Sequence, residues 1–290
     1  MDLLKNKVAV ITGGSRGLGL AIARAYVREG AAVVIGSRSA ETVQRAVDEL
    51  KQAGARASGL PCDVASQEQV QALADHATAT FGRLDVWVNN AGVAGPYGPT
   101  LSVDPAAFVH VIEANILGVY HGSRVAMFQF MAQGHGKLIN MLGRGYNGPV
   151  PFQNAYASSK AWVYSFTRAL AKETSGSGVG VFALAPGMMA TDFLTQVDVI
   201  DGYQDRLKSM GTIIRMWAKP PEDAALKAVW LASSATDGQT GKVVKLMGLG
   251  SMVGGALREG FRRLARQAPP PPVNLTVVPN QASHGTKNLS

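Results

Sequence analysis

Short apolar segments alternate with amphipathic segments along most of the chain. The apolar runs are rich in β-branched residues, which is typical of strands buried on both faces. They lie at residues 7–12, 32–35, 57–60, 84–88, 137–141 and 179–184. Helical spacing of apolar residues predicts helices at 18–28, 40–53, 66–81, 104–133 and 155–174. This alternation predicts an α/β protein in which a parallel sheet is covered by helices on both faces.

The pattern changes after residue 190, where bulky apolar residues become frequent. We interpret residues 188–220 as a helical lid over a pocket. Its large apolar residues are Phe193, Leu194, Tyr203, Leu207, Met210, Met216 and Trp217. A helix at 222–232 and a last strand at 241–247 then complete a single domain over residues 1–250.

Residues 251–290 form a C-terminal extension. A helix is predicted over 252–267, although Gly260 interrupts it and the prolines at 269–272 stop it. One side of this helix is apolar and the other is rich in arginine, so it can dock on a neighbouring subunit, lie on an anionic membrane surface or remain a solvated helix. We favour subunit docking, and expect residues 268–290 to be mobile or to lie along a partner subunit.

Composition excludes several classes of protein. Hydrophobic residues make up 47% and charged residues 17% of the 290 positions, which excludes disorder of the whole chain. The single cysteine, Cys62, excludes an intramolecular disulfide, and five scattered histidines give no metal-ligand spacing. No uncharged apolar run reaches the ~18 residues of a membrane span. A soluble protein in the reducing cytoplasm is therefore expected.

The net charge of +8 is compatible with a polyanionic partner. Residues 251–290 hold five of the lysines and arginines and one glutamate, so half of the excess lies outside the predicted domain. Arginines interleaved with aromatic residues, as in RNA-binding proteins, are absent. Nucleic acid is therefore not an expected partner.

Residues 12–19 read T-G-G-S-R-G-L-G, directly after a predicted strand and before a predicted helix. Glycines in such a turn let the backbone approach a pyrophosphate, and the helix N-terminus adds free N–H groups and a positive dipole end. We therefore predict a dinucleotide site here. Its residues in this loop are Gly13, Ser15, Arg16, Gly17, Leu18 and Gly19.

The end of the second strand decides which dinucleotide binds. An acidic residue there would accept hydrogen bonds from the adenosine ribose, but this chain has Ser37 and Arg38. A hydroxyl and a guanidinium suit a 2′-phosphate, and Arg16 adds a second positive charge. We predict NADP(H) rather than NAD(H). The alternative is that both arginines are merely solvated.

Residues 155–160 read A-Y-A-S-S-K and place Tyr156 and Lys160 four residues apart on one helix face. A phenol with a pKa of about 10 is a poor acid or base near neutral pH until a neighbouring ammonium stabilises its phenolate. Tyr156 is therefore the candidate acid/base.

Together these motifs resemble the short-chain dehydrogenase/reductase family in its common single-domain form. From residue 7 to about residue 250, the chain carries the family's motifs in order: T-G-G-S-R-G-L-G, Asp63-Val64, Asn89-Asn90-Ala91-Gly92, Asn115, Y-A-S-S-K, Pro186-Gly187 and Thr191. The resemblance implies a doubly wound Rossmann fold with about seven parallel strands and with hydride transfer at their carboxyl ends. The stretches at 140–145 and 187–194 are also similar to bacterial members resembling chlorophyll b reductase.

The resemblance implies specific roles around the cofactor. Asp63, next to Val64, would contact the adenine, and Asn89, followed by Ala91 and Gly92, would shape the adenosine pocket. Pro186, Gly187 and Thr191 would frame the nicotinamide.

It also implies the catalytic roles and the assembly. Tyr156 would be the acid/base, and Lys160 would hold the nicotinamide ribose and lower the tyrosine pKa. Asn115 would kink its helix and position a water in a proton relay. The helices at 104–133 and 155–174 would pair between subunits of a homodimer or homotetramer.

One position departs from the family pattern. A serine is expected thirteen residues before the tyrosine, but this chain has Gly143. Three interpretations remain. Tyr156 works with a backbone N–H near Gly143 or with the Tyr146 hydroxyl; the glycine makes room for a bulky substrate; or the protein is a dinucleotide-binding sensor or scaffold without turnover. Retention of Tyr156, Lys160 and Asn115 argues against the last.

The predicted lid gives the clue to the substrate. Its apolar, partly flexible side chains favour a bulky hydrophobic carbonyl or alcohol, and the alternative is that they only pack the lid. Arg144 and Tyr146 are expected near a polar substituent of the substrate. The apolar candidates are Met188, Met189, Phe193 and Trp217.

Overall fold

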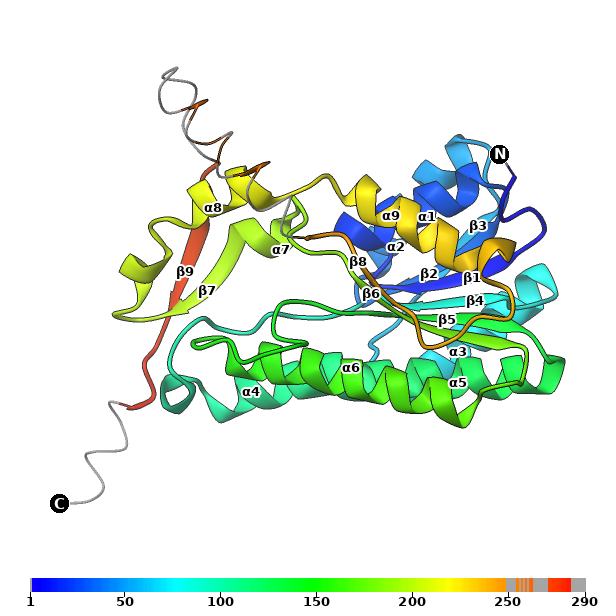
Figure 1. Cartoon of the computed structure of the whole chain (residues 1–290), viewed down its shortest axis with the longest axis horizontal. Helices are drawn as coiled ribbons and strands as arrows, with labels where there is room; N and C mark the ends of the chain where they lie inside the picture. Colours follow the sequence, from blue (N-terminus) through cyan, green and yellow to red (C-terminus); the bar gives the residue numbers. More distant parts are fainter. Residues whose placement is uncertain are drawn as a thin grey trace.

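The computed structural model describes residues 2–248 and 271–282, together with residues 254, 255, 257, 259, 261 and 262. Seven strands form one parallel sheet in the order β3-β2-β1-β4-β5-β6-β8 (Figure 1). Successive strands are added on one side of β1 up to β3 and on its other side from β4 onward, and this change of side creates the crevice where such folds bind ligands. The strands are β1 (Val8–Thr12), β2 (Ala32–Ser37), β3 (Ala57–Pro61), β4 (Val86–Asn89), β5 (Gly136–Met141), β6 (Val179–Ala185) and β8 (Val243–Lys245).

Helices cover both faces of this sheet, as predicted. One face packs against α1 (Gly17–Arg28), α2 (Ala40–Gln52) and α9 (Pro221–Ala232) (Figure 1). The other packs against α3 (Gln67–Phe81), α5 (Gly118–Gln133) and α6 (Asn154–Glu173). Alternate residues of β1 enter the two cores, so that every residue of the strand is buried. This burial explains the uninterrupted apolar runs in the sequence.

The long helix predicted at 104–133 has an irregular turn in its middle. It divides into α4 (Pro105–Ile112), a π-helical turn (Glu113–Leu117) and α5. Such turns interrupt the regular hydrogen-bond ladder and are frequent at functional sites. Asn115 lies in this turn, in agreement with the expected kink.

The predicted lid differs from the expectation, because it is not wholly helical. It contains α7 (Asp192–Thr195), β7 (Gln196–Ile200), a 3₁₀ turn (Gln204–Leu207) and α8 (Met210–Trp217). Val197 and Val199 alternate with polar residues, which is a strand pattern hidden among bulky side chains.

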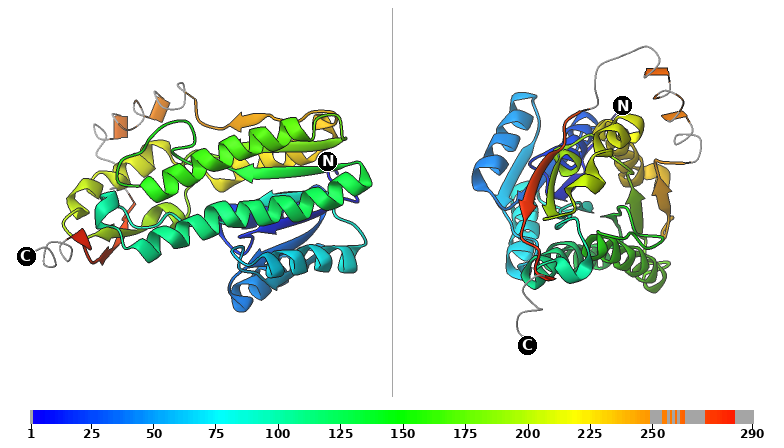
Figure 2. Two further views of the ribbon diagram at one scale, coloured as in Figure 1. Left: turned by 90° about the horizontal axis from the view of Figure 1, so that it is seen from below. Right: turned by 90° about the vertical axis from the view of Figure 1, so that its left-hand side faces the viewer.

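The expectation for residues 268–290 also requires correction. Residues Asn274–Val278 form β9, which pairs in parallel with β7 of the same chain (Figures 1 and 2). This part of the tail is therefore a strand that pairs within its own chain. The predicted helix at 252–267 falls largely outside the described residues; those described at 254, 255, 257, 259, 261 and 262 are helical.

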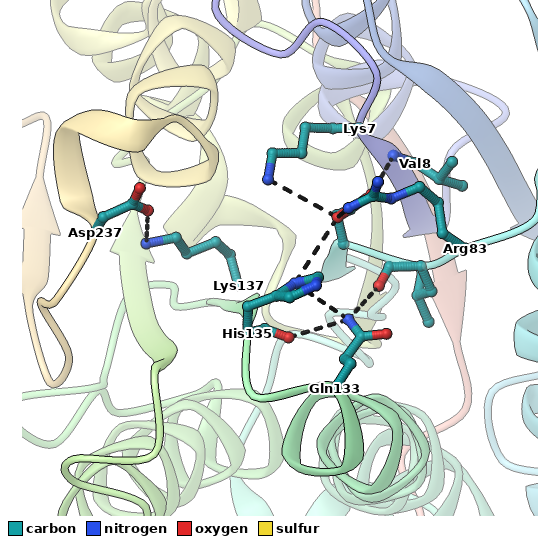
Figure 3. Close-up of polar contacts among 9 residues, drawn as sticks. Lys7, Val8, Arg83, Gln133, His135, Lys137 and Asp237 are labelled. Carbon is teal, nitrogen blue, oxygen red and sulfur yellow. Dashed lines mark hydrogen bonds and ion pairs between the residues drawn. The ribbon is translucent and has the colours of Figure 1, made fainter.

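A polar cluster joins the amino ends of β1, β4 and β5, at the opposite edge of the sheet from the carboxyl ends (Figure 3). The buried Asp85 carboxylate accepts hydrogen bonds from the Val8 N–H at 2.9 Å and from Arg83 at 2.6 and 2.8 Å. Lys137 donates to the Thr236 carbonyl at 2.9 Å. These contacts satisfy buried charges and fix the amino end of β1.

Among the described residues, no helix is both long and apolar enough to cross a bilayer.

Candidate active site

The glycine loop between β1 and α1 has the tight geometry that its sequence predicts. Gly13 and Gly17 have φ angles of 63° and 54°, a region that favours glycine. A Cβ on Gly19 would overlap the Gly13 carbonyl oxygen, so the close approach of α1 to the turn also requires glycine. The Asn90 amide donates to the carbonyls of Thr12 and Gly13 at 3.0 and 3.2 Å and holds the turn from β4.

The start of α1 offers hydrogen-bond donors. Arg16 occupies the N-cap position and makes no capping hydrogen bond through its side chain. The first backbone N–H groups of a helix have no acceptor within the helix, and they favour an anion. These donors fit the pyrophosphate of a dinucleotide. Leu18 and Gly19 are in the first turn of α1.

Hydroxyl groups gather where the glycine loop meets the end of β2. Ser15 donates to Ser37 at 3.0 Å, and Thr42 donates to Ser15 at 3.3 Å. Arg16 and Arg38 are exposed on either side, and neither forms an ion pair or hydrogen bond through its guanidinium in the part of the chain that the structure describes. The chemistry of this group fits a phosphate monoester.

The two other residues predicted at the adenosine, Asp63 and Asn89, lie in different surroundings. Asp63 follows β3 and accepts a hydrogen bond from the Ala65 N–H at 3.0 Å, with buried Val64 between them. The Asn89 side chain instead lies in the core, where it donates to Asn140 at 2.8 Å and accepts from Trp87 at 2.7 Å. This side chain therefore lies among core partners, and its part in shaping the adenosine pocket stays a prediction.

Two neighbouring residues that the sequence reasoning missed, Asn90 and Thr12, hold the loop after β4 against the glycine loop. The Thr12 hydroxyl accepts hydrogen bonds from the backbone N–H groups of Asn90 and Ala91 at 3.1 and 3.2 Å. The available signal for Thr12 was a polar residue at the end of an otherwise apolar strand, next to the glycine loop. The Thr12 hydroxyl fixes the position of Ala91 and Gly92 beside this loop.

Tyr156 and Lys160 both belong to the first half of α6. The Lys160 Nζ lies 5.6 Å from the centre of the Tyr156 ring and donates to the Met141 carbonyl at 3.2 Å. A Cβ on Gly92 would lie 3.6 Å from the same Nζ, so the end of β4 faces this lysine. The predicted pair is thus brought together with the loop after β4.

Asn115 connects the π-helical turn to this pair. Its Oδ1 accepts from the Val93 N–H at 2.8 Å, and its Nδ2 donates to the Val93 carbonyl at 2.9 Å and to the Ser159 hydroxyl at 3.0 Å. These partners are distant in sequence, so the amide is not satisfied within its own helix. Ser159, which the sequence reasoning missed, links Asn115 to α6.

The Tyr156 phenol occupies the space beside Gly143. A Cβ on Gly143 would overlap the Tyr156 hydroxyl oxygen and lie 2.8 Å from Cζ. The serine expected at this position therefore cannot be added unless Tyr156 moves. The glycine permits the observed position of the phenol.

The sequence analysis also expected Tyr146 and Arg144 near the missing serine. Tyr146 packs against other side chains, and Arg144 is exposed to solvent. The Tyr146 ring packs 5.5 Å from the Tyr164 ring, with the Lys245 Nζ 5.7 Å from its centre. Of the two donors considered in the sequence analysis, the backbone near Gly143 is the one adjacent to the phenol.

Burial controls the protonation of the pair. It raises the pKa of Tyr156 well above its ordinary value, and it lowers the pKa of Lys160 from 10.5 to about 8. In the free protein, loss of solvation therefore raises the pKa of Tyr156, in the direction opposite to the expected lowering by lysine. A lysine with a pKa of about 8 can exchange a proton near neutral pH.

This pKa predicts a pH-dependent stability difference. Replacing Lys160 by methionine should raise the free energy of unfolding at pH 7 by about 2 kcal/mol, because the desolvation cost of about 3 kcal/mol exceeds the value of one lost hydrogen bond, about 1 kcal/mol. Below pH 8 both states are protonated and the cost is full. Between pH 8 and 10.5 the unfolded chain binds more protons, so the wild type gains about 3 kcal/mol of stability and the difference reverses, to about 1 kcal/mol in favour of the wild type at pH 10.5. Urea unfolding at pH 7, 9 and 10.5 measures this, and a pH-independent difference would contradict it.

The predicted lid reaches Tyr156 through Phe193. The two ring centres are 5.8 Å apart, and 44% of the Phe193 surface remains exposed. Thr191 faces the glycine loop, because a Cβ on Gly17 would lie 3.6 Å from its Cγ2. Phe193 therefore borders the phenol of Tyr156, and Thr191 borders the glycine loop.

The remaining lid candidates have structural contacts. Met189 is buried, and the Met188 N–H donates to the Met247 sulfur at 3.4 Å. Pro186 is buried at the end of β6, and Gly187 adopts a φ of 76° beside Met247. Trp217 packs close to Gly255 of the C-terminal extension. No cluster of metal-ligating side chains exists among the described residues.

Comparisons with known proteins agree with this arrangement. The family model for short chain dehydrogenase matches residues 7–199. A 3beta-hydroxysteroid dehydrogenase 1 of Eggerthella lenta is 37% identical over 242 residues, which cover 83% of this chain and 92% of that protein. A cis-4-hydroxycyclohexanecarboxylate dehydrogenase of Sinomonas cyclohexanicum is 36% identical over 252 residues, or 85% of this chain and 97% of that protein.

Solved structures show the same fold. A 3-ketoacyl-(acyl-carrier-protein) reductase from Brucella melitensis, complexed with NADH, aligns with a TM-score of 0.76 at 30% identity, covering 86% of this chain and 99% of that one. An actinorhodin polyketide ketoreductase with NADPH aligns with a TM-score of 0.76 at 27% identity, covering 83% and 96%. The family match, the relatives and the shared sheet lead to one conclusion: this chain belongs to the short-chain dehydrogenase/reductase family.

Proposed function

We propose that the protein is an NADP(H)-dependent oxidoreductase that interconverts a carbonyl and an alcohol on a bulky hydrophobic substrate. The observation that carries the proposal is the position of the Tyr156 phenol, beside Lys160 and under Phe193 at the carboxyl edge of the sheet. A proton donor next to an ammonium and an apolar ring is suited to the reduction of a carbonyl group.

Each residue has a part in this reaction. Tyr156 donates its phenolic proton to the carbonyl oxygen during reduction and accepts it back during oxidation. Lys160, with a pKa of about 8, stabilises the phenolate and exchanges the proton. Asn115 and Ser159 hold the chain around the pair. When bound, the nicotinamide cofactor supplies or accepts the hydride.

The glycine loop and the end of β2 would hold the cofactor. The N-terminus of α1 would receive the pyrophosphate, and Thr191 would close over it. Ser15, Ser37, Arg16 and Arg38 provide hydroxyls and positive charge for a 2′-phosphate, without an acidic residue to repel it. This charge pattern supports NADP(H) over NAD(H).

The substrate proposal rests on apolar side chains and on named relatives. Phe193 leaves part of its ring exposed next to Tyr156. Relatives include enzymes named for hydroxysteroids and a hydroxycyclohexanecarboxylate, which carry the alcohol on an apolar ring. A cyclic ketone or alcohol is therefore the first class to test.

Restoring the family serine should impair this enzyme. Gly143→Ser is expected to lower kcat about tenfold, because the added Cβ displaces the phenol from its place beside Lys160. The KM for NADPH should stay within about twofold. Gly143→Ala adds the same Cβ without the hydroxyl and should give the same loss. A higher kcat for the serine variant alone would contradict the steric explanation.

A turnover assay tests the proposed function. Purified protein is incubated with NADPH or NADH and a panel of ketones from acetone to multi-ring compounds, and cofactor absorbance is followed. We expect oxidation of NADPH with the larger cyclic ketones. Binding of NADPH without turnover on the whole panel would favour the non-catalytic sensor or scaffold, the alternative that the missing serine raises.

An assembly of two or four subunits is part of the proposal. Large apolar side chains on α5 are exposed in the isolated chain, including Phe128 at 64% and Met131 at 48%. Apolar area of this kind is typical of subunit contacts. Light scattering of the purified protein would measure the mass.

A further inference from the structure

Two described parts of the C-terminal extension contact the lid (Figures 1 and 2). The first contact is the strand pair β7–β9, whose register runs from Gln196 opposite Asn274 to Ile200 opposite Val278. The Asp201 N–H continues it by donating to the Val278 carbonyl at 2.9 Å. The extension thus adds a full strand to the lid.

The other edge of β7 is held by the main domain. The Tyr97 N–H donates to the Asp198 carbonyl at 2.8 Å, and the Ile200 N–H donates to the Tyr97 carbonyl at 3.0 Å. Beyond β9, the Gln281 N–H donates to the Ser102 carbonyl at 3.1 Å. Strand β7 of the lid is therefore bonded to the loop after β4 on one edge and to β9 on the other.

The second contact is a buried ion pair. Glu259 of the extension is 4% exposed and accepts a hydrogen bond from the Arg215 Nε on α8 at 2.8 Å. A charged pair removed from water depends on both partners, so it commits the extension to one position on α8. Both ends of the lid, β7 and α8, are attached to residues beyond 250.

The attachment is close to the reacting group. Phe193 lies three residues before β7 and its ring packs on Tyr156, with centres 5.8 Å apart. Without β9, the strand pairing of β7 among the described residues would consist only of its two backbone hydrogen bonds to Tyr97, and so small a paired unit is marginally stable. The position of Phe193 over Tyr156 therefore depends on the pairing of β7 with β9.

We propose that β9 is a positioning element of the substrate site: it holds β7, and with it Phe193, over Tyr156, and so limits the size of the substrate that reaches the phenol. The substrate part of this proposal rests on the proposed function. The effect on the lid does not, because it concerns backbone pairing alone.

Truncation separates the strand from the rest of the tail. A chain ending at residue 270 lacks β9, whereas a control chain ending at residue 282 keeps it. Hydrogen exchange of residues 193–201 should be at least about tenfold faster in the shorter chain and unchanged in the control. Thr276→Pro removes a backbone N–H in the middle of β9 and should act like the shorter truncation, whereas Thr276→Val retains the N–H and the branched side chain.

Kinetics then test the role in substrate selection. Loss of β9 should raise the KM for the preferred cyclic ketone about fivefold or more and reduce the discrimination between large and small ketones. The Kd for NADPH should stay within about twofold, because the glycine loop is untouched.

The outcomes are distinguishable. Unchanged exchange of residues 193–201 in both the short chain and Thr276→Pro would overturn the proposal. Faster exchange with an unchanged KM and size preference would overturn the substrate role. Faster exchange in a protein that turns over no ketone in any form would instead overturn the proposed function and leave the attachment of the lid standing.

Discussion

Tyr156→Phe is expected to lower kcat/KM for ketone reduction by about 10²–10⁴, the range typical of a lost general acid. The phenol is the proton donor adjacent to Lys160, and phenylalanine keeps the ring that packs against Phe193. The loss should therefore appear in the chemical step. The Kd for NADPH, measured by fluorescence titration, should change less than about twofold.

A second tyrosine on the same helix provides the matched control. Tyr164 packs against Tyr146 and not against Phe193, so Tyr164→Phe should retain activity within about twofold. If Tyr156→Phe kept more than a tenth of the wild-type activity, the assigned acid would be wrong. If it also lost NADPH binding, its effect would not be chemical.

Arg38→Asp is expected to change the preference for NADPH over NADH by at least about a hundredfold. It removes a charge-assisted contact to the 2′-phosphate, which is worth about 1.5–3 kcal/mol, and adds a carboxylate that repels it. The same carboxylate can accept hydrogen bonds from the ribose of NADH. The ratio of kcat/KM for the two cofactors measures the change.

The control for this variant is Arg28→Asp, at the other end of α1. Arg28 is also exposed, and the substitution changes the net charge equally. It should leave the cofactor ratio within about twofold. An unmoved ratio in Arg38→Asp, or an equal shift in both variants, would show that Arg38 does not read the 2′-phosphate.

Most of the sheet was predictable because both of its faces are buried. Continuous apolar runs then mark each strand, and glycines mark the turn that brings α1 close to β1. β7 could not be found this way. It is only five residues long, its partner β9 lies more than seventy residues later in sequence, and the bulky apolar side chains on either side of it in sequence favoured a helical lid.

The site was predictable at the level of residue types more than of orientations. The spacing of Tyr156 and Lys160 predicted their proximity, and the absence of a serine at 143 was visible. That the phenol fills the space of the missing side chain depends on how α6 packs on β5, which no local pattern encodes. The same applies to Asn89, whose side chain direction depends on core partners from other elements.

The central claim is that Tyr156 and a bound nicotinamide act on the same carbon centre, one by proton transfer and the other by hydride transfer. Incubation of a cyclic ketone with NADPH that carries deuterium at both positions of C4 of the nicotinamide tests this, with mass spectrometry of the alcohol. We expect one deuterium on the carbinol carbon with the wild type and almost none with Tyr156→Phe in the same time. An alcohol without deuterium, or equal labelling by both proteins, would contradict the account.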